Sequence, residues 1–133
     1  MSAQGNLSLW ASLGGGLSNQ SQEDSKQSVH RLLEEWGLGA ASRSKLPVQH
    51  FSTGMRRRLA LARIALSRAP CLLLDEPLYG LDQDGLSLFR QLVERHRTKG
   101  GITLIVSHDE GPILDLVGKT FTLASTRKAG SSQ

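Results

Sequence analysis

Two apolar runs in this sequence are closely followed by side chains that could act on a phosphate. Asp75 and Glu76 come directly after residues 71–74, and His108 follows residues 102–106 after a single serine. Adjacent carboxylates suit magnesium–nucleotide chemistry, because one can hold the metal through water while the other orients or deprotonates an attacking water. Taken alone, the pair is equally well explained as a cap on the turn that follows.

A second candidate for phosphate contact lies upstream, where Ser52, Thr53 and Gly54 precede a run of good helix-forming residues. Small residues at a helix N-terminus leave backbone N–H groups free, and the positive end of the helix favours an anion. The same residues also make an ordinary helix N-cap, which by itself is the commoner explanation. The phosphate hypothesis therefore depends on the other motifs in the chain.

Hydrophobic periodicity predicts the elements that would position these residues. Apolar residues at helical spacing predict helices around 29–36, over 55–66 and around 86–93. The continuous apolar run 71–74 predicts a short strand that is buried on both faces, and residues 102–106, which are apolar except for Thr103, predict a second buried strand.

Several smaller signals complete the pattern. Glycines are expected to end the first helix at Gly37 and Gly39, Pro112 is well placed to start a short helix, and residues 120–123 could form a last strand. Strand, helix and strand at these spacings predict an α/β layer with parallel strands and right-handed crossovers. Ligands collect at the carboxyl ends of such strands, so Asp75, Glu76 and His108 form the candidate site.

Composition limits the alternatives for a chain of 133 residues with a net charge of +4 and a pI near 9.7. The single cysteine, Cys71, excludes a disulfide framework and a cysteine-based zinc cage within the chain. No run approaches the roughly 18 consecutive apolar residues of a membrane span. The mildly basic balance, with 5% aromatic residues, does not indicate a nucleic-acid binder.

The chain divides into three parts by composition. Residues 1–28 are rich in Gly, Ser, Gln and Asn and are expected to be a flexible leader, or else the continuation of a domain whose earlier part is missing. Residues 29–125 carry the periodic pattern and the motifs. Residues 126–133 are expected to be a flexible tail.

The order of the motifs resembles that of the ATP-binding-cassette (ABC) ATPases. A signature motif at 51–54 leads into the run 55–63, and a Walker B strand follows at 71–77. A D-loop at 80–82 and an H-loop at 107–108 complete the series.

This resemblance covers about residues 47–123 and implies a partial P-loop NTPase (ABC ATPase) fold, in which parallel strands are flanked by helices. It implies ATP and Mg²⁺ as cofactors. Asp75 would be the metal-side carboxylate acting through water, Glu76 the general base, and His108 the switch residue that contacts the γ-phosphate.

The resemblance also implies a dimer of ATPase domains. Ser52, Thr53 and Gly54 would contact a nucleotide held mainly by the partner subunit, and Asp82 would lie at the dimer seam. Thr53 stands where the family usually has glycine, and its Cβ and hydroxyl could weaken the γ-phosphate contact. Phe51 and Met55 stand where leucine and glutamine are usual.

A narrower resemblance points to the ATP-binding subunit of the haem exporter of cytochrome c maturation. It rests on the lead-in at 46–48, the degenerate signature, the strand entry at 100–102 and the short tail. Multidrug-type and ABC-2-type exporter ATPases share the arginine-rich run of the signature helix, so they stay as alternatives. An ABC membrane subunit is the implied partner, on the cytoplasmic face of the inner membrane or, alternatively, on the matrix side of the mitochondrial inner membrane.

The phosphate-loop (Walker A) pattern G-x-x-x-x-G-K-[ST] occurs nowhere in these residues, and 14–18 lacks the required lysine and preceding apolar strand. We therefore expect the chain alone to bind ATP weakly or not at all and to be inactive without a Walker A-bearing chain. The alternatives are a non-catalytic truncated cassette that acts as an interaction module and, less favoured, an ATPase fragment acting on nucleic acid. Against the latter, no stacking aromatics accompany the arginines at 56–58.

Overall fold

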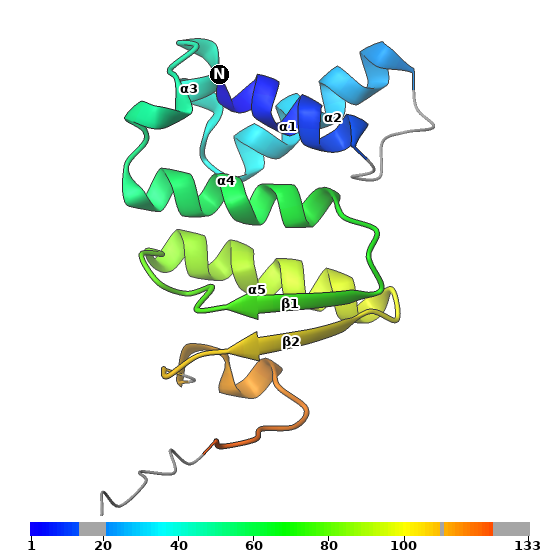
Figure 1. Ribbon diagram of the computed structural model, residues 1–133, viewed down its shortest axis with the longest axis vertical. Helices are drawn as coiled ribbons and strands as arrows, with labels where there is room; N and C mark the ends of the chain where they lie inside the picture. The colour runs from blue at the N-terminus through cyan, green and yellow to red at the C-terminus, as the bar shows by residue number, and fades with distance from the viewer. Residues whose placement is uncertain (14–20, 110, 124–133) are drawn as a thin grey trace, which may run out of the picture.

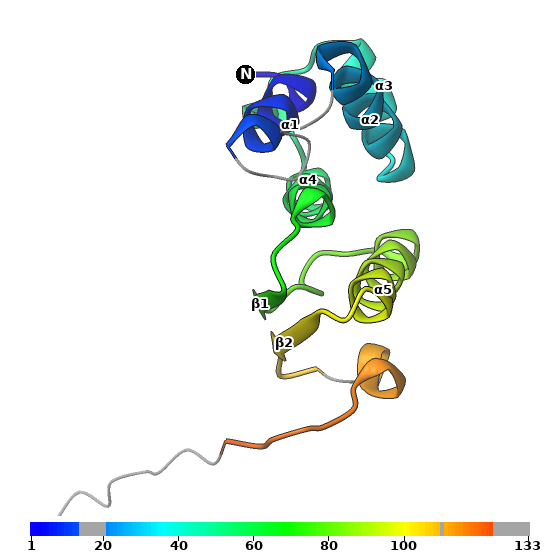
Figure 2. The same cartoon turned by 90° about the vertical axis from the view of Figure 1, so that its right-hand side faces the viewer.

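The computed structural model describes residues 1–13, 21–109 and 111–123. Helices α1, α2 and α3 gather at one end, α4 lies next to them, and a small sheet with α5 forms the other end (Figures 1 and 2). The elements are α1 (Ala3–Ser12), α2 (Gln22–Glu35), α3 (Gly39–Arg43), η1 (Val48–His50), α4 (Thr53–Leu66), β1 (Cys71–Asp75), α5 (Gln83–Thr98), β2 (Ile102–Val106) and η2 (Gly111–Leu116). None of the described helices is long and apolar enough to cross a bilayer.

The expectation of a flexible leader over residues 1–28 is wrong for most of its described part. Ser2 caps α1, and the small and apolar residues Ala3, Leu7 and Ala11 recur every four positions along it, so they form one buried stripe. Ser21 caps α2, which starts well before the expected position. Polar composition misled the prediction, because three buried residues are enough to pack a short helix; residues 14–20 lie outside the described part.

The expected helical face around 29–36 is confirmed. Val29, Leu33 and Trp36 are at most 2% exposed and belong to one core with Leu7 of α1. Gly37 adopts a φ of +68° where α2 ends, as expected of a glycine that stops a helix. Gly39 instead begins α3, so its role as a stop signal was wrong.

The two predicted strands are present and parallel. Cys71 pairs with Ile102 and Asp75 with Val106, and α5 connects the strands and packs on β2. The mixed α/β class with a parallel sheet is thus confirmed.

The prediction that the strands are buried on both faces is wrong. Along β1, Leu72 and Leu74 are buried, whereas Leu73 is 74% exposed. On β2, Leu104 and Val106 are more than half exposed. The sheet has two strands, and within the described residues its helical cover lies on one face only.

The segment after β2 differs in part from expectation. Pro112 is the second residue of η2, a short 3₁₀-helix, in line with the helix expected there. Residues 120–123 do not form the expected strand and pair with neither β1 nor β2. The tail expected at 126–133 lies outside the described residues.

Candidate functional site

The carboxyl ends of the two strands bring Glu76 and His108 into contact. Because Asp75 and Val106 are paired in register, the residues that follow each strand emerge at one edge of the sheet. Oε1 of Glu76 contacts Nδ1 of His108, and the Ser107 hydroxyl donates a hydrogen bond to Oε2 of Glu76 at 3.4 Å. The structure therefore assembles this part of the candidate site as expected.

Glu76 is held there by its backbone as well as by its side chain. Its φ of +44° lies in the left-handed region, which is uncommon for a residue with a Cβ. Its N–H donates to the carbonyl of Val106 at 2.8 Å, which ties the turn to the end of β2. Unusual backbone conformations of this kind persist where surrounding contacts enforce them, and they cluster at functional sites.

Asp75 lies on the other side of the chain from this contact. Side chains alternate along a strand, so Asp75 shares the exposed face of β1 with Leu73 and Cys71. Within the described part of the chain, the Asp75 carboxylate forms no hydrogen bond or ion pair. It is therefore free to bind a cation or a water molecule.

The donor set near Asp75 fits a magnesium ion that is held mostly by a nucleotide. Mg²⁺ commonly takes one or two protein carboxylates, with phosphate oxygens and water completing its shell. The described residues contain no group of three His, Cys, Asp or Glu side chains that could hold a metal by themselves. The single carboxylate of Asp75 at the end of β1 therefore matches the number of protein ligands that such an ion takes.

The signature residues form a second group at the N-terminus of α4. The Ser52 hydroxyl accepts a hydrogen bond from the Met55 N–H at 3.2 Å, so Ser52 is the N-cap of that helix. A Cβ added to Gly54 would lie 3.4 Å from the carbonyl oxygen of Gly80, which means that the loop after β1 runs close to the helix end. Ser52 and Thr53 are exposed at the N-terminus of α4.

Asp82 has a well-defined structural partner set. Its carboxylate accepts from the Gly85 N–H at 2.8 Å as the N-cap of α5, and from Arg58 at 2.6 and 2.8 Å. The Gly85 N–H and then the Arg58 guanidinium lower the pKa of Asp82 below its ordinary value. These contacts join α4 to α5, and they leave the predicted role of Asp82 at a dimer seam untested.

The sequence analysis did not predict the hydrogen bonds that Arg57 and Arg58 form. Arg57 donates to the carbonyl of Tyr79 at 3.1 Å, and Arg58 donates both to Asp82 and to the carbonyl of Trp36. The three consecutive arginines at 56–58 indicated only a basic cluster. No local pattern identifies a partner 22 or more positions away in the chain.

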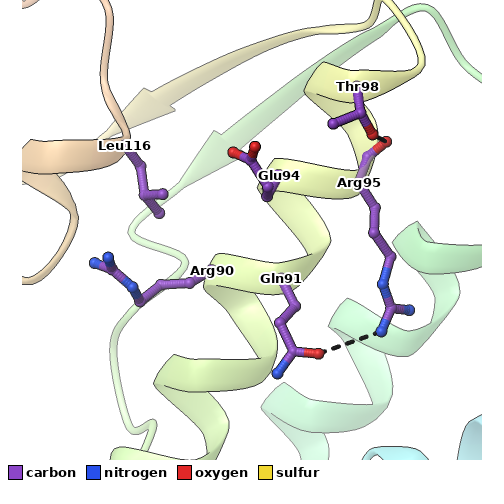
Figure 3. Close-up of a pocket in the computed structure, with 6 residues that line it drawn as sticks. All are labelled: Arg90, Gln91, Glu94, Arg95, Thr98 and Leu116. Carbon is purple, nitrogen blue, oxygen red and sulfur yellow. Dashed lines mark hydrogen bonds between the residues drawn. The ribbon is translucent and has the colours of Figure 1, made fainter.

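An open hollow of about 400 Å³ lies away from these residues (Figure 3). Side chains of α5 and the end of η2 line it, and no predicted site residue is among them. The lining residues are Arg90, Gln91, Glu94, Arg95, Thr98 and Leu116.

Comparison with known proteins gives a consistent result. The sequence pattern of the ABC transporter family matches residues 2–79, more than half of the chain. That match includes α1 and the first half of α2, which the sequence analysis had assigned to a leader over residues 1–28, together with Ser52 to Gly54, Asp75 and Glu76.

The chain is also similar to curated proteins named cytochrome c biogenesis ATP-binding export protein CcmA. It is 36% identical to the protein of Albidiferax ferrireducens over 110 residues, which are 83% of this chain and 49% of the relative. It is 42% identical to the protein of Haemophilus influenzae over 81 residues, 61% of this chain and 37% of the relative. It is 36% identical to the protein of Pasteurella multocida over 104 residues, which are 78% of this chain and 48% of the relative. The chain thus spans half or less of the length of these relatives.

Proposed function

This chain belongs to the ABC transporter family of ATP-binding domains, and we propose that it forms the signature-bearing part of an ATPase subunit of a haem-exporter-like transporter in cytochrome c biogenesis. The observation that carries the proposal is the contact of Glu76, Ser107 and His108 at the carboxyl ends of two parallel strands. In a member of this family, that edge of the sheet is the place where phosphoryl transfer would occur. The similarity to cytochrome c biogenesis ATP-binding export proteins supports the export role.

Each residue of the strand-end group has a proposed part in ATP hydrolysis. Glu76 would orient the attacking water and accept its proton, since its carboxylate is fixed by two side-chain contacts and remains partly exposed. His108, 86% exposed, would turn from Glu76 to donate a hydrogen bond to the terminal phosphate. Asp75 would hold Mg²⁺ through water, and the ion, when bound, would supply positive charge to the phosphate oxygens.

The signature residues at 52–54 would contact a different nucleotide from the one on which Glu76 and His108 act. Ser52, Thr53 and Gly54 lie exposed or half-buried at the N-terminus of α4, where free N–H groups and the helix dipole favour a phosphate. We assign them to the nucleotide held by a second ATPase domain. Asp82 would support that contact indirectly, because it fixes α5 to the signature helix through Arg58.

The proposed assembly has three further components. They are a polypeptide segment that carries the Walker A loop, a second ATPase domain, and an ABC membrane subunit that ATP-driven closure would move. Docking on that membrane subunit would place the chain at the cytoplasmic face of the inner membrane or, alternatively, on the matrix side of the mitochondrial inner membrane. Nucleic acid is not among the proposed partners.

The test is Mg²⁺-dependent ATP hydrolysis by this chain mixed with a Walker A-bearing polypeptide. Glu76→Gln should lower the rate by about 100-fold or more, because the carboxylate that accepts the proton is lost. Glu94→Gln is the matched control, since Glu94 pairs with Arg97 on α5 and should leave the rate unchanged. Equal rates for Glu76→Gln and the wild type would overturn the assignment.

A non-catalytic interaction module is the second candidate, and one observation favours it. Thr53 places a branched side chain in the signature, and its methyl group faces Gly80 across the loop. A mixture that binds tightly but hydrolyses no ATP, with hydrolysis gained in Thr53→Gly, would support this module.

A further inference from the structure

One arginine of α5 forms hydrogen bonds with the short helix that follows β2. Nη1 of Arg90 donates to the Pro112 carbonyl and to Oδ1 of Asp115, both at 2.8 Å. Nη2 of Arg90 donates to Oδ2 of the same carboxylate, so the pair is bidentate. Hydrogen bonding within this pair raises the pKa of Arg90 and lowers the pKa of Asp115. Arg90 thus holds η2 at two points, near its start and one turn further on.

The helix that Arg90 holds is too short to be stable by itself. η2 spans six residues, and the hydrogen bonds of a 3₁₀-helix have poorer geometry than those of an α-helix. Ile113 attaches η2 to the core, where it is 2% exposed. Figure 3 shows Arg90 extending from α5 on the side where Leu116 lies. The position of η2 therefore depends on its contacts with α5, and Arg90 forms the three hydrogen bonds described above.

The segment that ends at η2 is the one that carries His108. Val106 ends β2 and Gly111 begins η2, so four residues, 107–110, connect the two elements. The Ser107 hydroxyl accepts a hydrogen bond from the Asp109 N–H at 3.2 Å and donates one to the Asp109 carbonyl at 3.0 Å, which closes a turn around His108. Because the connection is short and the turn is closed, a shift of η2 would also move the backbone of His108.

The position of this backbone matters because His108 has two partners in the proposed function. Its Nδ1 contacts Oε1 of Glu76, and the ring would turn from there to the terminal phosphate. The ring can exchange these partners by rotation alone if its backbone stays in place. A misplacement of about 1 Å in a reacting group can cost about 100-fold in rate. A residue that fixes the far end of this segment would therefore affect hydrolysis without contacting the nucleotide.

We propose that Arg90 is a positioning residue for His108, because its hydrogen bonds to Pro112 and Asp115 fix η2 against α5 and thereby set the place of His108 beside Glu76. This inference rests on the proposed function. The side chains of Arg90 and Asp115 are 34% and 68% exposed, and exposed ion pairs contribute little to global stability. Loss of Arg90 should therefore loosen the segment after β2 and leave the rest of the fold intact.

The first measurement is amide hydrogen exchange in the full chain without nucleotide. Arg90→Met keeps a long aliphatic side chain and removes the donors. Exchange at 107–109 and 111–117 should become about tenfold faster or more, while exchange at 29–36 stays unchanged. Arg97→Met is the matched control, since Arg97 pairs with Glu94 on its own helix. Equal exchange after β2 in Arg90→Met and the wild type would overturn the proposal.

The second measurement is ATP hydrolysis by this chain mixed with the Walker A-bearing polypeptide. Arg90→Met should lower kcat by about fivefold or more and leave KM for ATP within about twofold, since it misplaces a group that acts in the transition state. Arg90→Lys keeps the charge without the planar fork and should recover part of this loss. Arg97→Met should retain the wild-type rate.

A double variant tests whether Arg90 acts through His108. If it does, Arg90→Met combined with His108→Ala should hydrolyse ATP as fast as His108→Ala alone, because the group that Arg90 positions is already absent. A merely structural role would slow both backgrounds by the same factor. Losses that multiply in the double variant would overturn the proposal.

The outcomes separate this proposal from the proposed function. Faster exchange in Arg90→Met, with no hydrolysis by the wild-type mixture, would remove the proposed function and leave Arg90 as the residue that positions the His108 turn. Hydrolysis by the wild-type mixture that Arg90→Met leaves unchanged would keep the proposed function and remove the role of Arg90.

Discussion

The helical end and the sheet end of this molecule both contain apolar side chains but differ in how completely these are covered. At the helical end, Leu7, Leu33 and Trp36 are at most 2% exposed. At the sheet end, Leu73 and Ile102 are more than two-thirds exposed. The difference indicates that the first end is packed by its own residues, whereas within the described residues the second leaves one face of its sheet uncovered.

The largest expected effect tests whether the helical end is packed by its own residues. Leu7→Ala should lower the free energy of unfolding by about 2–5 kcal/mol, because it leaves a cavity between α1 and the core. Leu73→Ala should change it by less than about 0.5 kcal/mol, since that side chain already lies in solvent. Urea unfolding followed by circular dichroism measures both. Similar values for the two variants would remove the contrast between the ends.

A smaller effect is expected where the sheet end stores strain. Asn tolerates the left-handed region better than Glu, so Glu76→Asn should leave the free energy of unfolding unchanged or raise it by up to about 1 kcal/mol. The same variant should lose hydrolysis in the reconstituted mixture. Thermal unfolding gives the first quantity and a phosphate-release assay the second. A clear loss of stability would mean that the contacts of Glu76 with Ser107 and His108 outweigh the strain.

The smallest expected effect concerns the joint between the two ends, where Arg58 and Asp82 meet. The pKa of Asp82 is lowered in the folded chain, so its contribution to stability is complete above the ordinary aspartate pKa of about 3.9 and is lost as the pH falls through the lower, folded value. The melting temperature should therefore fall by a few degrees below about pH 4. Asp82→Asn keeps an N-cap and should flatten this part of the curve. An identical pH profile for the variant would show that the pair contributes nothing.

Much of the fold could be predicted because it rests on local patterns. The strand Ile102–Val106 has the predicted bounds, and α4 begins two residues before the predicted start because Ser52 caps it. Helical spacing likewise identified the buried face of Val29, Leu33 and Trp36.

The errors have a common physical cause. Continuous apolar runs predict strands, but exposure of Leu73 or Val106 depends on what covers the sheet, and a strand's own sequence does not contain that information. Similarly, α1 is short and only half apolar, and it is stabilised by packing on α2 and α4 rather than by its own propensity.

The position of the candidate site could be predicted because it depends on where the two strands end. Parallel strands bring their carboxyl ends together, so the positions of Glu76 and His108 at one edge followed from the two runs, whereas their direct contact was not predicted. The contact between Asp82 and Arg58 was not predicted either, because it depends on the tertiary distance between α4 and α5.

The central claim is that this chain carries one part of an ATP site and needs a phosphate-loop segment to complete it. The most direct measurement is the rate of Mg²⁺-dependent ATP hydrolysis by the chain alone, by the Walker A-bearing polypeptide alone, and by the two together. We predict background rates for each component and hydrolysis in the mixture that saturates at equal molar amounts. Hydrolysis by this chain alone, abolished by Glu76→Gln, would contradict the claim.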